Sequence, residues 1–192
     1  MSNMPNMLAY TIRGSFFPNS PPLMVVGQGP SKVAITPTNP VDDSYWFVFL
    51  DRNNPKAKAK DFVIPGQNNT TVPAGVDAYM SNPQYIFAVV TQFLSMLHLP
   101  QGPFFDYLIK YGAGRELRRI EQLNSAFGCG SLSRPCYILT GQGGPRGDKI
   151  IPPPSYELGS VSNIQYLTMS LMPMPDGNPP YAICDQLTRT NP

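Results

Sequence analysis

The sequence predicts a mainly β fold of the α+β class, in which β-sandwich-like sheets carry two short helices packed on one side. Two observations lead to this fold class. Many short runs rich in Val, Ile, Tyr and Phe are separated by turn residues, and the 23 prolines are scattered between these runs. A single stretch, residues 104–123, changes to the spacing of an amphipathic helix.

Nine short segments have the composition of strands, because they are rich in β-branched or aromatic residues and bounded by turn residues. They are Leu8–Arg13, Leu23–Val26, Lys32–Thr36, Tyr45–Asp51, Ala59–Ile64, Tyr85–Gln92, Pro135–Gly141, Asn163–Leu171 and Tyr181–Asp185. The run Tyr45–Leu50 is apolar at every position, which predicts a central strand buried on both faces.

The middle of the chain predicts two helices. Apolar residues recur there at spacings of three and four, at Phe104, Phe105, Leu108, Tyr111, Leu117, Ile120 and Leu123. Gly112 and Gly114 interrupt the pattern. We therefore expect helices over Pro103–Tyr111 and Arg115–Ala126, joined at a glycine corner. Each has an apolar stripe that must be buried against a sheet.

The chain of 192 residues has the usual length of one domain. We expect residues 1–22 to form an extended N-terminal segment and residues 23–151 to form the main part of the domain. The triple proline Pro152–Pro154 favours a stiff, extended connection. Residues 152–192 are expected to add strands that complete the same domain.

Composition favours a neutral polar partner. Charged residues make up 14% of the chain, against about 25% in a typical domain. The formal net charge of +2 is too small for the basic surface that phosphate binding requires, which argues against nucleic acid as a partner. Uncharged side chains and backbone amides are therefore expected to cover much of the exterior.

The sequence shows neither a secretory signal nor a membrane span. Residues 1–7 lack a positive segment followed by an apolar one, and the most apolar run, Ile86–Leu99, is shorter than the roughly 20 residues needed to span a bilayer. The cellular compartment is left open.

No catalytic motif is recognisable, so we expect the protein not to be an enzyme and to need no cofactor. The single histidine, His98, has no Ser or Cys nucleophile placed beside it by a known motif, and we interpret it as structural. The adjacent acids Asp42 and Asp43 lie in a loop rich in Pro and Asn, where turn formation explains them. The Gly-rich stretch 141–147 is followed by prolines and not by a helix, which favours a β-turn over a phosphate loop.

Three cysteines leave the redox state open. Cys129 and Cys136 are seven residues apart, too wide for one arm of a zinc site, and no second arm follows, so no metal is expected. The two can close a small disulfide loop, leaving Cys184 free, or stay as a reduced, partly buried pair. Both alternatives agree with the spacing.

Three pieces of the chain occur in a characteristic order: the apolar strand Tyr85–Gln92, the helical segment up to Ala126, and Arg134–Pro145, a strand ending in a Gly-rich turn. As an ordered set they resemble the ILEI/PANDER (interleukin-like EMT inducer) domain family, over roughly residues 23–150. Tyr45–Asp51 and the region around Phe62 are similar to the family's earlier strands.

The resemblance implies a β-sandwich-like fold flanked by helices and without catalytic activity. This fold is seen in secreted cytokine-like proteins and in the lectin-like stem domain of an O-mannose N-acetylglucosaminyltransferase. There, an arginine before an aromatic strand and an aspartate at the end of an apolar strand hold a sugar. Arg134, three residues before Tyr137, matches the arginine, whereas Gln92 departs from the aspartate. An amide can still bond to sugar hydroxyls.

We therefore expect a non-catalytic binding module, carbohydrate-binding and lectin-like, with Arg134, Gln92 and Tyr137 as its ligand-binding residues. The alternative is a structural or assembly subunit, such as a virion or appendage component, that self-associates as a homo-oligomer through strands and extended termini. Nine methionines could serve its contact surfaces. A cytokine-like signalling ligand is a third class. The partner is accordingly a glycan or a protein.

Overall fold

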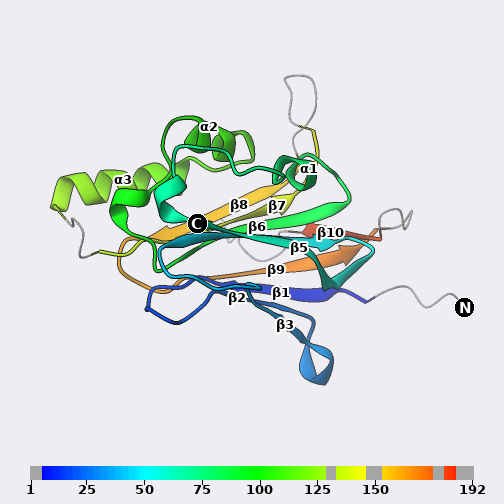
Figure 1. Cartoon of the computed structure of the whole chain (residues 1–192). Coiled ribbons are helices and arrows are strands. Elements are labelled where there is room, and N and C mark those ends of the chain that lie inside the picture. Colours follow the sequence, from blue (N-terminus) through cyan, green and yellow to red (C-terminus); the bar gives the residue numbers. More distant parts are fainter. Residues whose placement is uncertain (1–5, 129–132, 146–152, 175–179, 185–192) are drawn as a thin grey trace, which may run out of the picture.

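A computed structural model describes residues 6–128, 133–145, 153–174 and 180–184. These residues form two five-stranded antiparallel sheets packed face to face. Helices cover the outer face of one sheet, so the fold has three layers, with the helices at the top of Figure 1. The predicted fold class, mainly β with short helices on one side of a sandwich, is confirmed.

The first sheet, sheet A, has the strand order β10-β9-β1-β2-β3. Its strands are β1 (Leu8–Arg13), β2 (Leu23–Val26), β3 (Val33–Ile35), β9 (Tyr166–Pro173) and β10 (Tyr181–Cys184). The N-terminal strand β1 lies in the middle, paired with β2 on one side and with β9 on the other. Within residues 1–22, strand β1 contributes Tyr10 and Ile12 to the core. The last two strands, β9 and β10, share its sheet.

The second sheet, sheet B, has the order β5-β4-β6-β7-β8. Its strands are β4 (Ser44–Asp51), β5 (Asn54–Pro65), β6 (Tyr85–Gln92), β7 (Cys136–Gln142) and β8 (Ser155–Ser160). The helices are α1 (Asp77–Met80), α2 (Gly102–Lys110) and α3 (Arg115–Phe127), with 3-10 turns at Gly29–Ser31, Gly66–Asn68 and Met96–His98. Neither β8 nor α1 was predicted, because each is short and lacks a clear apolar period.

Sheet B is the central layer and is buried on both faces. On β4, Trp46, Val48 and Leu50 belong to the core shared with sheet A. The alternate residues Tyr45, Phe47 and Phe49 belong to the core under the helices. Full burial of each such side chain contributes roughly 1.5–3 kcal/mol. The prediction of a strand with two apolar faces is therefore confirmed at β4, which lies between β5 and β6.

The corner between α2 and α3 requires glycine. Gly112 has a φ of 99°, which side chains rarely adopt, and a Cβ built there would lie 1.8 Å from the Oγ of Ser155 in β8. The close approach lets the helix pair lie directly on sheet B, where Phe104 and Leu117 join the core. The predicted glycine corner is thus a point of contact between the helices and β8.

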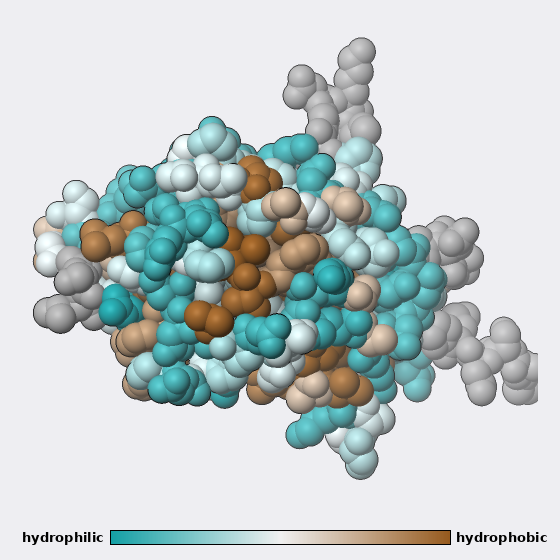
Figure 2. Space-filling model, viewed as in Figure 1, coloured by the Kyte–Doolittle hydropathy of each residue, from teal (hydrophilic) through white to brown (hydrophobic). Residues whose placement is uncertain are grey.

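The surface is largely polar although the chain carries few charges. On the face shown in Figure 2, hydrophilic residues predominate, and hydrophobic residues gather across its middle. The most exposed large apolar side chains in the described part of the chain are Phe127, Leu97, Tyr166, Phe17 and Val41. Hydrophilic residues thus predominate on this face, and the prediction that most of them are uncharged rests on the composition.

Asp61 on β5 links sheet B to the connection between β3 and β4. Its carboxylate accepts hydrogen bonds from the backbone N–H (2.8 Å) and the hydroxyl (2.8 Å) of Thr38, and from the Trp46 indole (3.2 Å). It also forms an ion pair of 2.9 Å with Lys58. Pairing between β4 and β5 is irregular near Lys58, which brings Lys58 and Asp61 to the same face. Burial alone would raise the pKa of Asp61, but the bonds from Lys58, Thr38 and Trp46 lower it below its usual value.

Replacement of Asp61 by Asn should destabilise the protein in a pH-dependent way. Loss of the charge-assisted bonds should cost about 1–3 kcal/mol of unfolding free energy at neutral pH. Because the folded pKa is lowered, this contribution is complete above the unfolded pKa of about 3.9 and is lost as pH falls through the folded value. Urea unfolding of both proteins across a pH series measures it. Asp106→Asn, an exposed carboxylate on α2, is the control. A difference that persists undiminished in acid would contradict the assignment.

The sheets also meet closely where β1 ends. A Cβ added to Gly14 would lie 2.2 Å from the Sγ of Cys136 on β7. Cys136 is fully buried and forms no disulfide with another described residue, and burial raises the pKa of its thiol to about 11. Cys129, the partner in the predicted disulfide, lies outside the described residues, so this pairing stays a prediction. Cys136 is in either case a packing residue between the sheets.

Gly14→Ala should destabilise the protein by about 1–3 kcal/mol, because the added methyl group overlaps the Cys136 sulfur. The double variant Gly14→Ala with Cys136→Ala should recover part of this loss, since the sulfur is then absent. Unfolding free energies of the wild type, both single variants and the double variant give the coupling energy. Strictly additive effects would show that the two residues do not compete for the same space.

Candidate functional site

The candidate site lies at one end of the sandwich, the left end in Figure 1, where β6 ends. The connection between β1 and β2 folds over this end. Ser15 forms an isolated parallel bridge with Gln92, the last residue of β6, and its N–H donates to the Thr91 carbonyl at 3.4 Å. The Ser15 hydroxyl donates to the Ser20 carbonyl and so closes the loop. The loop is thereby held against the strand end.

Asp42 connects this loop to the connection between β3 and β4. Its two carboxylate oxygens accept from the Asn19 N–H at 3.0 and 3.2 Å. Its Oδ1 also accepts from the Gln92 Nε2 at 3.2 Å. Asn19 has a φ of 55°, in the left-handed region that Asn tolerates better than most residues. A single carboxylate therefore joins two loops and the end of β6.

A hollow of about 400 Å³ opens at this junction. Its lining comprises Asn19, Pro21, Pro40, Asp42 and Gln92. Gln92 is only 2% exposed, and its Oε1 has no hydrogen-bond partner among the described residues. The amide orientation is determined by Asp42, since a carboxylate accepts hydrogen bonds and must face the Nε2 group. Gln92 therefore contributes to the lining of the hollow a buried amide whose Oε1 is unpaired within the described residues.

Arg134 lies at the same end of sheet B, but outside the lining of the hollow. Its guanidinium carbon is 4.7 Å from the ring centre of Phe93, the residue that follows Gln92. Such a cation–π contact holds the planar guanidinium in place. Arg134 thus stacks on the ring of the residue next to Gln92, and its role in binding a ligand stays a prediction.

Tyr137 lies on the other face of sheet B, away from the hollow. Its ring is 1% exposed and packs in the core under the helices. Its hydroxyl donates to the Glu157 Oε2 at 2.9 Å. Burial, followed by the charge of Glu157, raises the pKa of Tyr137 well above its usual value. Tyr137, expected to bind ligand, therefore serves the packing of the helices.

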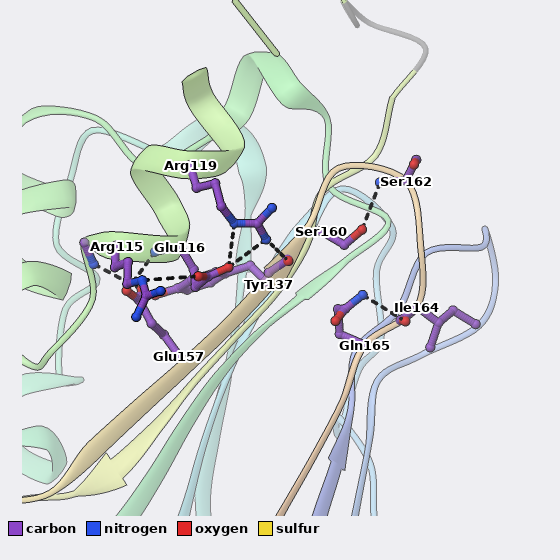
Figure 3. Close-up of polar contacts among 11 residues, drawn as sticks. Arg115, Glu116, Arg119, Tyr137, Glu157, Ser160, Ser162, Ile164 and Gln165 are labelled. Carbon is purple, nitrogen blue, oxygen red and sulfur yellow. Dashed lines mark hydrogen bonds and ion pairs between the residues drawn. The ribbon is translucent and has the colours of Figure 1, made fainter. Parts of the chain in front are cut away.

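Glu157 is the centre of the cluster in Figure 3. Besides the Tyr137 hydroxyl, it accepts from the backbone N–H groups of Gly114 (3.1 Å) and Glu116 (2.8 Å) at the start of α3. A carboxylate in this position satisfies unpaired amides and complements the helix dipole. Arg119 bonds to Glu116 at 2.7 Å and to the Gly159 carbonyl. These contacts fasten α3 to β7 and β8, which is a structural role.

His98 is hydrogen-bonded to Asp43, the residue that follows Asp42 in the sequence. The Nδ1 of His98 lies 2.7 Å from the Asp43 Oδ2, and the Asp43 Oδ1 accepts from the Ser95 N–H at 2.8 Å. Within the described part of the chain, no hydroxyl or thiol bonds to the other ring nitrogen of His98. The pair holds the segment after β6 against the connection before β4. This agrees with the structural interpretation of His98.

The described residues contain no group of three or more His, Cys, Asp or Glu side chains that could hold a metal ion. None of the helices in those residues has the length and apolar character to cross a bilayer.

Sequence reasoning did not identify Asn19, Pro21, Pro40 and Asp42. Asp42 was interpreted as a turn residue, and its partner Gln92 is 50 residues away. The one available signal was a pair of adjacent carboxylates just before a buried strand. A loop carboxylate of this kind acquires its role only when the fold brings β6 beside it.

The chain matches no family model in a scan of protein-family models, and a search of the curated proteins also finds no match. The similarity to the ILEI/PANDER family therefore remains an expectation from the sequence. The functional assignment that follows rests on the fold and on the hollow beside Gln92.

Proposed function

We propose that the protein is a non-catalytic binding module that holds a carbohydrate in the hollow beside Gln92. The observation that carries this proposal is the buried Oε1 of Gln92, which has no hydrogen-bond partner in the described chain. Leaving a buried acceptor unpaired costs about 1–3 kcal/mol. A ligand hydroxyl that donates to Oε1 would remove this cost.

The remaining walls of the hollow suit a sugar ring. Asp42 and Asn19 offer polar groups, while Pro21 and Pro40 offer rigid apolar surface. Small-ligand sites combine apolar walls with a few fixed polar groups in this way. The low charge of the chain also favours a neutral polar ligand over a phosphorylated one.

Arg134 supports the proposal from beside the hollow. The family resemblance implies that an arginine here contacts sugar, and a guanidinium carries five donors in a fixed fork. Because Arg134 stacks on Phe93 and does not line the hollow, we expect it to contribute less to binding than Gln92.

Self-assembly through strand edges has weaker support. The longest edge strand, β5, carries Lys56, Lys58 and Lys60, and lysines on an edge oppose pairing with another chain. Lys56 and Lys58 also bond to carbonyl oxygens of Ser31 and Thr36, which links β5 to the connections of sheet A.

A glycan array probed with the wild type and three variants tests the proposal. Gln92→Met keeps the side-chain volume but removes the acceptor, and should weaken binding about tenfold, the equivalent of one hydrogen bond. Arg134→Ala should weaken it less. Tyr137→Phe is the control, because this residue faces the opposite core, and it should leave binding unchanged. Circular dichroism checks that each variant is folded.

Two results would contradict the proposal. One is a wild-type protein that binds no glycan on the array; sedimentation would then test self-association as the alternative. The other is a folded Gln92→Met variant that binds the same glycans as strongly as the wild type. Loss of binding in Tyr137→Phe alone would move the site to the helical side of sheet B.

A further inference from the structure

We propose that the hollow selects neutral sugars over acidic sugars, and that Asp42 is the positioning residue that sets this selectivity. The inference rests on the proposed function and concerns the chemical class of its ligand. Two observations support the inference: the kinds of hydrogen-bonding groups that the hollow can offer to a ligand, and the negative charge of Asp42 beside them.

The available groups are mainly acceptors. Asp42 and the Gln92 Oε1 can accept but not donate, because Gln92 has turned its Nε2 toward Asp42. The Asn19 backbone N–H is already bonded to Asp42, so the donor left in the lining is the Asn19 side-chain amide, which can also accept. The Pro21 carbonyl accepts from Arg13 at 2.9 Å. Proline has no N–H to offer. A ligand that brings hydroxyl donors therefore fits this wall, whereas a ligand carboxylate brings acceptors to it.

The charge at the hollow acts in the same direction. Asp42 has no salt bridge with any Lys, Arg or His among the described residues. Arg13, which bonds to the Pro21 carbonyl, and Arg134, which stacks on Phe93, keep their charge, but neither side chain lines the hollow. Asp42 is therefore the charged residue in its lining. An acidic sugar would place its carboxylate near an unneutralised carboxylate, and like charges at such distances repel.

Asp42 also fixes the direction of the Gln92 amide. An Asn at position 42 could accept or donate through its own amide, so Gln92 could rotate and present its Nε2 to the hollow. The replacement would thus remove the negative charge and allow a donor to face the ligand. Both changes favour an acidic ligand, and neither alters the shape of the side chain much.

The chain contains a matched control at the other end of sheet B. Gln84 donates from its Nε2 to the Asp51 Oδ1 at 2.6 Å, the same type of amide–carboxylate contact. Asp51 ends β4, whereas Asp42 precedes the start of that strand. Asp51→Asn therefore makes the same chemical change outside the hollow.

The test compares matched ligands in NMR titrations of the labelled protein at neutral pH. The probes are the methyl glycosides of glucose, galactose and mannose, each paired with its uronate, in which a carboxylate replaces the C6 hydroxymethyl group. For the wild type we expect the neutral member of a binding pair to bind at least about tenfold more tightly. Asp42→Asn should reduce this ratio toward one, and Asp51→Asn should leave it unchanged.

The outcomes separate this inference from the proposed function. A uronate that binds the wild type as tightly as its neutral partner, with binding lost in Gln92→Met, overturns the selectivity but keeps the sugar site. An unchanged ratio in a folded Asp42→Asn variant overturns the role of Asp42. If neither series binds the wild type and the glycan array is also blank, the proposed function and the inference both fail.

Discussion

Burial of sheet B on both faces is the constraint on which the rest of the structure depends. Trp46 and its alternate neighbours need sheet A as cover, while Tyr45, Phe47 and Phe49 need the helices. Because both faces of the sheet carry large apolar side chains, exposing either face to water would cost much of the folding free energy. The order of layers follows directly from this requirement.

The position of the hollow is a consequence of the same arrangement. A central sheet ends in loops that must bridge two layers, and here the loops after β1 and β3 meet over the end of β6. Buried backbone amides at the junction need acceptors, and the Asp42 carboxylate accepts from the Asn19 N–H. Gln92 shares that carboxylate and keeps one acceptor unpaired. The contacts that hold the loops together thus leave one unpaired acceptor that a ligand could bond to.

Most of the fold could be predicted from local pattern. The bounds of β1, β2 and β6 agree with the sequence, and α2 and α3 agree within one residue, since their apolar periods are long and their ends carry turn residues or glycine. The strand β8 could not be found, because Ser155–Ser160 has little β-branched or aromatic character and owes its conformation to pairing with β7.

The candidate site could be predicted only in part. Gln92 and Arg134 entered through a family resemblance, and both lie at the expected strand end. Alternation shows that successive residues of a strand face opposite sides of the sheet, but it does not specify which side the helices cover. The sequence therefore could not place Tyr137 on the helical side. Asp42 depends on contacts 23 and 50 residues away, which no local pattern encodes.

The central place of β1 in sheet A has a consequence for how the chain folds during synthesis. β1 is made early, yet it pairs with β9, where Thr11 meets Thr168 from 157 residues further along. Until those last strands leave the ribosome, the Trp46 face of sheet B lacks part of its cover. Long-range pairing of this kind slows folding, and uncovered apolar surface favours aggregation. We therefore expect the nascent chain to depend on chaperone protection until β9 and β10 have emerged from the ribosome.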